Sequence, residues 1–274
     1  MTMKIAVLLS VSLFSASVFV AATTQSSNTF GLLRVDSTQK QTIVCVPWVA
    51  SSAADDQNIK VTDIVKTANL TVGDELYWYD SAATNYKAWN LVPGGEGKAP
   101  KWEAATSVTS AGVNPGTSAE NTAVARGNAI ILLRQNPTNE LGRANSFFLI
   151  GQVAQVGNVE NILPKAAVDD SDRKIPVYSL LAPPFASSAD TFDLNGTGVV
   201  WDMPNDEDVI NIPDRKVTLS WNKTAQKWGV CIPTLNGPDI VLTWTYDSAV
   251  ITSGCGAWYV NGGSSDVKVT WKAQ

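Results

Sequence analysis

Apolar and polar residues alternate over much of this chain, as they do in β-strands that bury one face. The alternation is regular over residues 217–221 and 267–271, where every second side chain is apolar. Residues 130–133 and 147–150 are short, unbroken apolar runs, which are typical of strands buried on both faces. Thirteen prolines and nineteen glycines punctuate the chain. The pattern therefore predicts an all-β fold with short strands and frequent turns.

One short helix is predicted over residues 62–68, in the first half of the chain. Thr62 is suited to the N-cap position, because its hydroxyl can accept a hydrogen bond from the first turn. Asp63 falls in that first turn, where the helix dipole favours a negative charge.

The second half of the chain repeats the pattern of the first. In the first half a strand ends at Val46-Pro47-Trp48, a hairpin rich in tyrosine and tryptophan follows, and the half closes on residues 123–133. The second half opens on residues 181–185, continues with a hairpin from Trp221 to Trp228, and closes on residues 249–259. The repeat predicts two related modules packed about a pseudo-twofold axis.

The N-terminus has the order of a secretory signal peptide. Lys4 precedes an apolar run over residues 5–20, and the small residues Ala21 and Ala22 follow. The run is shorter than the roughly 20 residues that a membrane-spanning helix needs. We therefore assign residues 1–22 to a signal peptide and expect a secreted or extracellular protein without a membrane span.

The mature chain is divided by its composition. We predict a first β module over residues 23–157, a connector over 158–174 and a second β module over 175–274. The connector holds Pro164 and the acidic cluster of residues 169–172. A mature chain of about 250 residues is long enough for two ordinary cores, so each module is expected to be barrel-like or a sandwich.

The closing motif of the second half reads Gly254-Cys255-Gly256-Ala257-Trp258-Tyr259-Val260. With the two apolar-Pro-aromatic openings and the Tyr-Asp hairpin with its tryptophans, it resembles a family of largely uncharacterised, duplicated, tryptophan-rich β proteins exported by bacteria. The first half departs from this motif, since Ala129 replaces the second glycine and the tryptophan is missing. The resemblance implies secretion and a β-rich fold.

The net charge and the absence of histidine limit the partners and the catalytic mechanisms that this protein can have. The chain has a net charge of −5, and an acidic protein repels phosphate backbones, so no nucleic-acid partner is expected. Histidine is absent, which excludes Ser-His-Asp and Cys-His nucleophilic systems and removes the commonest transition-metal ligand. Whether the protein is an enzyme stays open, but an enzyme of this composition would work mainly through carboxylates.

Ten tryptophans are a high content for this length. Indole rings stack on the apolar C–H faces of sugars, so exposed tryptophans in an extracellular protein indicate glycan binding. Trp78, Trp89 and Trp102 are the expected ligand-binding residues, because they flank the long loops of the first module. The alternative is that these side chains fill two small β cores.

The tetrapeptide Tyr-Asp-Ser-Ala occurs once in each half and places Asp80 and Asp247 in matching local sequence. It is distantly similar to the Asp-Thr/Ser-Gly that each half of a bilobal aspartic peptidase contributes, with alanine in place of glycine. In such enzymes two aspartates share one proton and act on a water as acid and base. Asp36, followed by Ser37, is a further candidate. The alternative is that these aspartates belong to turns.

Three cysteines are present. After export Cys231 and Cys255 could pair, which would leave Cys45 over and would contribute roughly 3 kcal/mol to stability. The alternative is three buried thiols that act as small apolar side chains.

An oxygen-rich loop includes Asp190, Asp193 and Asn195. Calcium prefers such ligands, although the spacing is not that of an EF-hand, and a solvated acidic turn is the alternative. No other cofactor is expected.

Three functions follow from these features. The first is a secreted bacterial protein that engages extracellular glycoprotein or polysaccharide, such as mucin, through loop tryptophans. The alternative is a carboxylate-dependent hydrolase, most concretely an aspartic-type peptidase that degrades mucin-like glycoprotein. The third is an envelope or matrix component that associates with itself through sheet edges.

Overall fold

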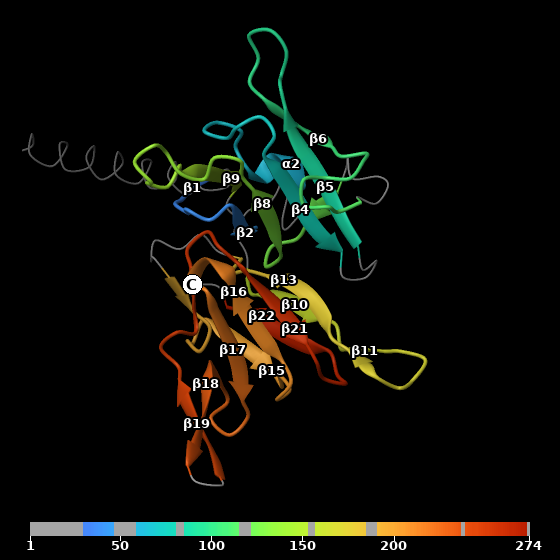
Figure 1. The fold of residues 1–274 in the computed structure, drawn as a ribbon, viewed down its shortest axis with the longest axis vertical. Helices are drawn as coiled ribbons and strands as arrows, with labels where there is room; N and C mark the ends of the chain where they lie inside the picture. The colour runs from blue at the N-terminus through green and yellow to red at the C-terminus, as the bar shows by residue number, and fades with distance from the viewer. Residues whose placement is uncertain are drawn as a thin grey trace, which may run out of the picture.

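A computed structural model describes residues 30–46, 59–80, 85–114, 122–152, 157–184, 191–236 and 239–272. Over these residues the protein is all-β, as the sequence predicts. Figure 1 shows two groups of strands, the first coloured blue to green and the second yellow to red. No sheet in the described ranges combines strands from both groups.

The first group is built on a five-stranded antiparallel sheet. Its strands, in spatial order, are β2 (Gln41–Cys45), β8 (Ala129–Leu133), β4 (Glu75–Asp80), β5 (Asn85–Val92) and β6 (Lys101–Ala104). Two strand pairs complete the group: β1 (Phe30–Val35) with β9 (Phe147–Gln152), and β3 (Ile59–Lys60) with β7 (Ala123–Val124).

The second group is built on a six-stranded sheet. Its strands, in spatial order, are β13 (Val177–Leu181), β21 (Ala257–Asn261), β16 (Val209–Ile212), β17 (Val217–Asn222), β18 (Lys227–Asn236) and β19 (Asp239–Thr245). The smaller sheets are β10 (Val159–Leu163) with β22 (Val267–Trp271) and β15 (Val199–Asp202), β14 (Thr191–Asp193) with β20 (Val250–Thr252), and β11 (Ala167–Val168) with β12 (Lys174–Ile175).

The two groups repeat one topology. The sheet order β2-β8-β4-β5-β6 corresponds strand for strand to β13-β21-β16-β17-β18, and β19 is an addition at the outer edge. The pairs β1–β9 and β3–β7 correspond to β10–β22 and β14–β20. Strand β10 lies inside the predicted connector and pairs with β22, so this part of the connector belongs to a sheet. The module boundaries themselves stay a prediction.

The sequence prediction matched the aromatic hairpin of the first half to the Trp221–Trp228 hairpin of the second half, and the structure shifts this correspondence by one strand. The hairpin β4–β5, which carries Trp78, corresponds to β16–β17. The Trp221–Trp228 pair joins β17 to β18 and corresponds to Leu91 and Trp102 on β5 and β6. Both hairpins of the first group carry aromatic residues, and sequence alone does not give the order of strands in a sheet.

The two groups meet through reciprocal backbone contacts. The Cys45 N–H donates to the carbonyl of Gly254 at 3.0 Å, and the Ala182 N–H donates to the carbonyl of Gly127 at 3.2 Å. Each bond runs from the end of an opening strand to the closing motif of the other group, as a pseudo-twofold relation requires. The buried hydrophobic residues form one continuous cluster that includes strands from both groups.

The glycine that begins each closing motif is required by backbone geometry. Gly127 and Gly254 have φ of +83° and +80°, a conformation that side chains disfavour. A Cβ atom at Gly254 would lie 2.6 Å from a methyl group of Val35 in the first group, and one at Gly127 would collide with Asn161 in the second. These glycines therefore permit both the turn and the close approach of the two groups.

The helix is shorter than predicted and begins earlier. Helix α2 spans Val61–Ile64, and Lys60, not Thr62, is its N-cap residue, with no side-chain capping bond. Val65 is extended because it forms a bridge with Leu149 of β9. The pairing with β9 ends the helix before residue 68.

A buried aspartate stabilises the turn that leads into β4 through hydrogen bonds to the backbone. The Asp74 side chain is 2% exposed and accepts hydrogen bonds from the backbone N–H of Thr71, at 2.9 Å, and of Gln135, at 2.7 Å. Because Gln135 follows β8, one carboxylate holds the turn and the neighbouring strand together.

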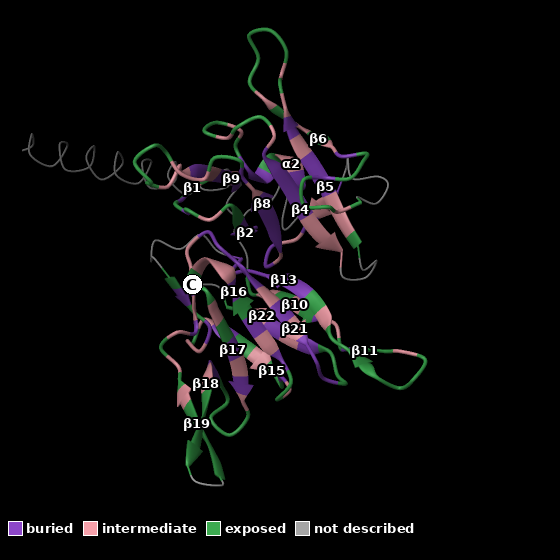
Figure 2. Cartoon of the chain, in the orientation of Figure 1, coloured by how far each residue is buried: buried purple, intermediate pink, exposed green. Residues whose placement is uncertain are grey.

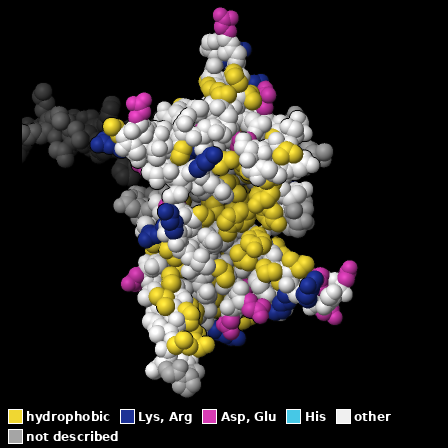
Figure 3. Space-filling model, viewed as in Figure 1, with side chains coloured by type: hydrophobic (Ala, Val, Ile, Leu, Met, Phe, Trp, Pro, Cys, Tyr) yellow, Lys and Arg dark blue, Asp and Glu magenta, His cyan; other side chains and the backbone are white. Residues whose placement is uncertain are grey.

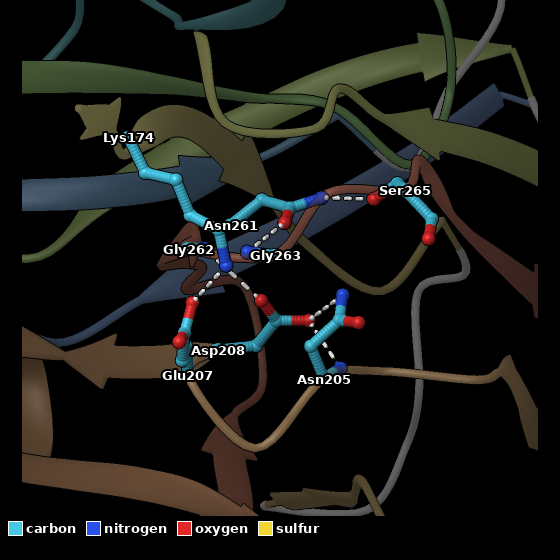
Figure 4. A network of polar contacts seen from close by, with 8 residues as sticks. All are labelled: Lys174, Asn205, Glu207, Asp208, Asn261, Gly262, Gly263 and Ser265. Carbon is cyan, nitrogen blue, oxygen red and sulfur yellow. Dashed lines mark hydrogen bonds and ion pairs between the residues drawn. The ribbon is translucent and has the colours of Figure 1, made fainter. Parts of the chain in front are cut away.

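Asp208 has the same role before β16. Its fully buried carboxylate accepts hydrogen bonds from the backbone N–H of Asn205 at 2.7 Å and of Gly262 at 3.1 Å (Figure 4). The hydroxyl of Tyr259, on β21, donates to the same carboxylate at 2.7 Å. Asp74 and Asp208 are therefore equivalent residues of the repeat, although sequence analysis did not single them out.

Candidate functional site

The three tryptophans predicted to bind ligand differ in exposure. The expectation is wrong for Trp89, which is 1% exposed and lies opposite the buried Leu76 in the core. Trp78 and Trp102 are half-buried and pack against the core. The ammonium group of Lys87 lies 5.4 Å from the centre of the Trp78 ring and covers one of its faces. Proximity to long loops was thus a poor guide to exposure.

Trp89 and Trp102 nevertheless contribute to one cleft of about 360 Å³. The cleft is also lined by Thr62, Glu103 and Ala104. The indole N–H of Trp102 donates to the carbonyl of Val65 at 3.2 Å, which fixes the ring against the body of the protein. With Trp89 almost completely buried, Trp102 is the half-exposed tryptophan of this cleft, and its described lining contains no row of exposed aromatic rings.

The two Tyr-Asp-Ser-Ala copies occupy different places in the repeat. Asp80 ends β4, in the middle of the first sheet, whereas Asp247 is exposed and follows β19 at the outer edge of the second. The residue equivalent to Asp80 is Asp214, in the 3-10 helix η2 (Pro213–Arg215), where it accepts a hydrogen bond from the Thr252 hydroxyl at 2.8 Å. A shared-proton pair of Asp80 and Asp247 stays a prediction that this arrangement does not favour.

Asp36, the third candidate, lies beyond the end of β1. A hydrogen bond from Ser146 is the main cause that lowers the pKa of its carboxyl, and Arg34, 3.0 Å away, adds to the effect. An exposed, ionised carboxylate in an ion pair is a common surface feature.

The predicted disulfide does not form. All three cysteines are free, with Cys45 and Cys255 buried and Cys231 half-buried. Cys231 lies on β18, which β16 and β17 separate from β21, the strand that follows Cys255. The neighbour of Cys255 is instead Val44 of β2, through an isolated antiparallel bridge. Cys231 and Cys255 belong to the same half of the chain but are therefore not adjacent in the sheet.

The predicted calcium loop is engaged in backbone contacts. Asp190 lies outside the described residues. The Asp193 carboxylate accepts the Asn195 N–H at 2.8 Å, and the Asn195 amide exchanges two hydrogen bonds of 2.8 Å with the backbone of Trp228. Within the described ranges no group of three or more acidic, histidine or cysteine side chains could hold a metal ion.

A row of four aromatic rings crosses the junction between the two groups of strands. Tyr86 on β5 is 4.9 Å from Tyr79 on β4, Tyr79 is 5.8 Å from Trp258 on β21, and Trp258 is 6.3 Å from Tyr178 on β13, measured between ring centres. Tyr178 is 50% exposed and the other three rings are half-buried. We call these four residues the aromatic ridge. Figure 3 shows hydrophobic side chains gathered where the two groups meet.

Strand alternation explains why the rings lie together. In the closing motif Ala257 and Tyr259 are fully buried, so Trp258 between them points to the other face of the sheet. Tyr79 and Tyr86 are directly opposite each other in the β4–β5 register and share a face. Alternation around Trp258 was the available sequence signal, but the contact between Tyr79 and Trp258 depends on the packing of the two groups.

Two tyrosines of the ridge, Tyr79 and Tyr86, hold their phenol protons more tightly than usual. Burial, followed by the nearby Asp80 carboxylate and the Tyr178 phenol, raises the pKa of Tyr79. Burial and the neighbouring Tyr79 also raise the pKa of Tyr86. A neutral phenol can both donate and accept a hydrogen bond. The ridge therefore combines apolar ring faces with polar hydroxyl groups, which is the combination that sugar rings require.

A cleft of about 550 Å³ with many charged residues in its lining lies in the second group of strands. Its lining includes Asp202, Asp206, Glu207, Asp266, Lys223 and Gln226. Lys174 pairs with Glu207 at 2.9 Å at this cleft (Figure 4). Trp221 also lines it but is only 5% exposed. The cleft thus offers hydrogen-bonding groups without an accessible stacking face.

Comparisons with protein-family models, curated proteins and solved structures found no match for this chain. The family resemblance therefore stays a prediction. Within the described residues no helix is long and apolar enough to cross a membrane.

Proposed function

We propose that this protein is a secreted glycan-binding protein that holds an extracellular polysaccharide or a mucin-type glycan chain on the aromatic ridge. The observation that carries the proposal is the row of four partly exposed rings, spaced 4.9 to 6.3 Å apart, that both groups of strands build together. The ridge replaces the loop tryptophans as the binding element.

The ring orientations favour a single, twisting sugar chain. Successive rings are inclined by 56°, 71° and 87°, so they do not form the flat platform that a crystalline polysaccharide surface needs. A chain whose sugar faces turn from one residue to the next could stack on each ring in succession. Four rings can contact only a short segment of the glycan chain, so the bound segment is an oligosaccharide of a few sugars.

The charge of the protein favours neutral sugars. Asp80 follows Tyr79 directly in the sequence, and the whole chain has a net charge of −5. Anionic sugars such as sialic acid would be repelled over roughly 10 Å at 0.1 M salt. We therefore propose neutral glycans as the preferred ligand.

The ridge supports binding better than hydrolysis. Glycoside hydrolysis uses two carboxyl groups on opposite sides of the scissile bond. Among the described residues, the carboxylate next to a ridge ring is Asp80, and the ring contacts supply no second one. A peptidase or glycosidase activity is not part of the proposal.

The test is retention of purified Thr23–Gln274 on immobilised mucin, before and after enzymatic removal of sialic acid. Tyr178→Ala removes the most exposed ring and should weaken retention about tenfold, since truncated aromatic anchors typically cost 1 kcal/mol or more. Trp78→Ala is the matched control, because Trp78 is half-buried on the neighbouring position of β4 and its side chain points to the opposite face from Tyr79.

The outcomes separate the proposals. Stronger retention on desialylated mucin, weakened about tenfold in Tyr178→Ala and kept in Trp78→Ala, is the expected result. Loss in Trp78→Ala with normal retention of Tyr178→Ala would restore the loop tryptophans as the binding element. Equal retention of all three proteins, or none by the wild type, would reject the aromatic ridge.

A further inference from the structure

The hairpin β18–β19 projects from the body of the protein and has one apolar face. Figure 1 shows it extending beyond the second sheet, and Figure 2 shows its outer part exposed. In the β18–β19 register, the residues on one face are Cys231, Pro233 and Leu235 opposite Trp244, Leu242 and Ile240. Leu235, Ile240 and Leu242 are 77%, 66% and 54% exposed. A contiguous apolar face of this kind marks an interaction surface.

Strand β19 also has an unprotected edge. Within the described residues it pairs with β18 alone, so a row of backbone N–H and carbonyl groups faces away from the sheet. Natural proteins protect such edges with short strands, lysine, proline or inward charges. β19 is seven residues long and contains no lysine, arginine or proline.

The outer edge of the first sheet, formed by β6, is protected. Strand β6 has four residues, and Lys101 and Glu103 on it form an ion pair at 2.6 Å. One molecule thus contains a blocked edge and an open one at related places in its repeat. The contrast indicates that the open edge of β19 is used.

We propose that β19 pairs with β19 of a second copy of this chain, antiparallel and centred on Leu242, to form a dimer with a sheet continuous across both copies. In this register Leu242 of one copy lies opposite Leu242 of the other, and Ile240 of one copy lies opposite Trp244 of the other. Val241 faces Thr243, and Asp239 faces Thr245. Apolar residues therefore meet apolar residues on the exposed face, and the carboxylate meets a hydroxyl. The register is self-complementary, as a twofold interface requires.

The composition of the hairpin favours a second copy over a lipid surface. Between Trp228 and Tyr246 the charged residue is Asp239, and there is no lysine or arginine. Binding to an anionic membrane surface relies on basic residues beside the apolar face. The ridge residues lie on β4, β5, β13 and β21, so this association is separate from the proposed glycan site.

The test is the mass of Thr23–Gln274 in solution, measured by analytical ultracentrifugation over a micromolar concentration series. Wild type should be dimeric. Leu242→Lys places two like charges opposite each other at the centre and should raise the dimer dissociation constant by at least about 30-fold. Thr234→Lys is the control: it adds the same charge to an exposed position of β18, on the other face and away from the free edge.

A mixture of charge variants tests the register. Leu242→Lys and Leu242→Glu should each be monomeric and should form heterodimers when mixed, because only this register places residue 242 opposite its copy. Circular dichroism of each variant verifies that it is folded. A monomeric wild type, a Leu242→Lys dimer as tight as wild type, or no rescue on mixing would overturn the proposal. So would a monomer that instead floats with vesicles of phosphatidylethanolamine and phosphatidylglycerol.

Discussion

Replacement of Asp208 by alanine should destabilise the protein far more than the same replacement of its repeat equivalent, Asp74. The Asp208 carboxylate accepts hydrogen bonds from Asn205, Gly262 and Tyr259. Gly262 and Tyr259 are themselves buried, so water cannot replace the lost acceptor. A buried donor left without a partner costs about 1 to 3 kcal/mol. Two such donors give an expected loss of about 2 to 6 kcal/mol for Asp208→Ala.

Asp74→Ala should cost less. Its carboxylate accepts two backbone hydrogen bonds, from Thr71 and Gln135, and both of these residues are exposed. Water can therefore satisfy the freed N–H groups, and the expected loss is about 1 to 2 kcal/mol. The difference between the two losses reflects the additional hydrogen bond at Asp208 and the burial of two of its donors.

Equilibrium unfolding in urea, followed by tryptophan fluorescence, gives the free energy of unfolding of each variant. Asp208→Asn is a second variant that keeps the volume of the side chain and one acceptor oxygen, and it should fall between wild type and Asp208→Ala. Equal losses at the two sites, or a loss below about 1 kcal/mol for Asp208→Ala, would refute the conclusion that the buried Asp208 carboxylate stabilises the fold through its hydrogen bonds.

Three further predictions concern the core and the thiols. Burial, followed by the hydrogen bond with Glu75, raises the pKa of Tyr77 from its ordinary value of 10.0 to about 12, so the folded state holds this proton more tightly than the unfolded state. The urea midpoints of wild type and Tyr77→Phe should therefore change in parallel below the ordinary pKa of 10.0, and above it the midpoint of wild type should fall more steeply than that of Tyr77→Phe. Trp89→Ala should lower the free energy of unfolding by about 3 to 5 kcal/mol, measured in the same assay, because the side chain is 1% exposed; a small effect would contradict its place in the core. Mass spectrometry of alkylated protein should find no disulfide, with Cys231 modified in the native state and the two buried cysteines only after unfolding; protection of Cys231 or a mass two hydrogens lighter would contradict the free thiols.

Alternation predicted the fold class because each strand buries one face. The segments 217–221 and 267–271 form strands as expected, and Trp221 and Trp271 are buried in phase with their apolar neighbours. The glycine that begins each closing motif has a positive φ, which is a local backbone requirement that glycine meets most easily. These features are local, and local patterns are what a single sequence records.

The remaining features depend on contacts between distant segments. Trp89 is buried because β5 lies between β4 and β6, which the sequence does not state. Cys255 adjoins Val44 and not Cys231 for the same reason. The aromatic ridge requires Tyr79 and Trp258 to meet across two groups of strands. Hydrophobic periodicity and motif spacing do not predict which distant segments of the chain pair with one another.

The most direct test of glycan binding by the ridge is saturation-transfer NMR on a mixture of Thr23–Gln274 and neutral oligosaccharides released from mucin. Saturation of the aromatic protons of the protein should reach the C–H protons on one face of the sugar rings, and the signal should be strongly reduced in Tyr178→Ala and persist in Trp78→Ala. A transfer that is absent from wild type, or unchanged in Tyr178→Ala, would contradict the account.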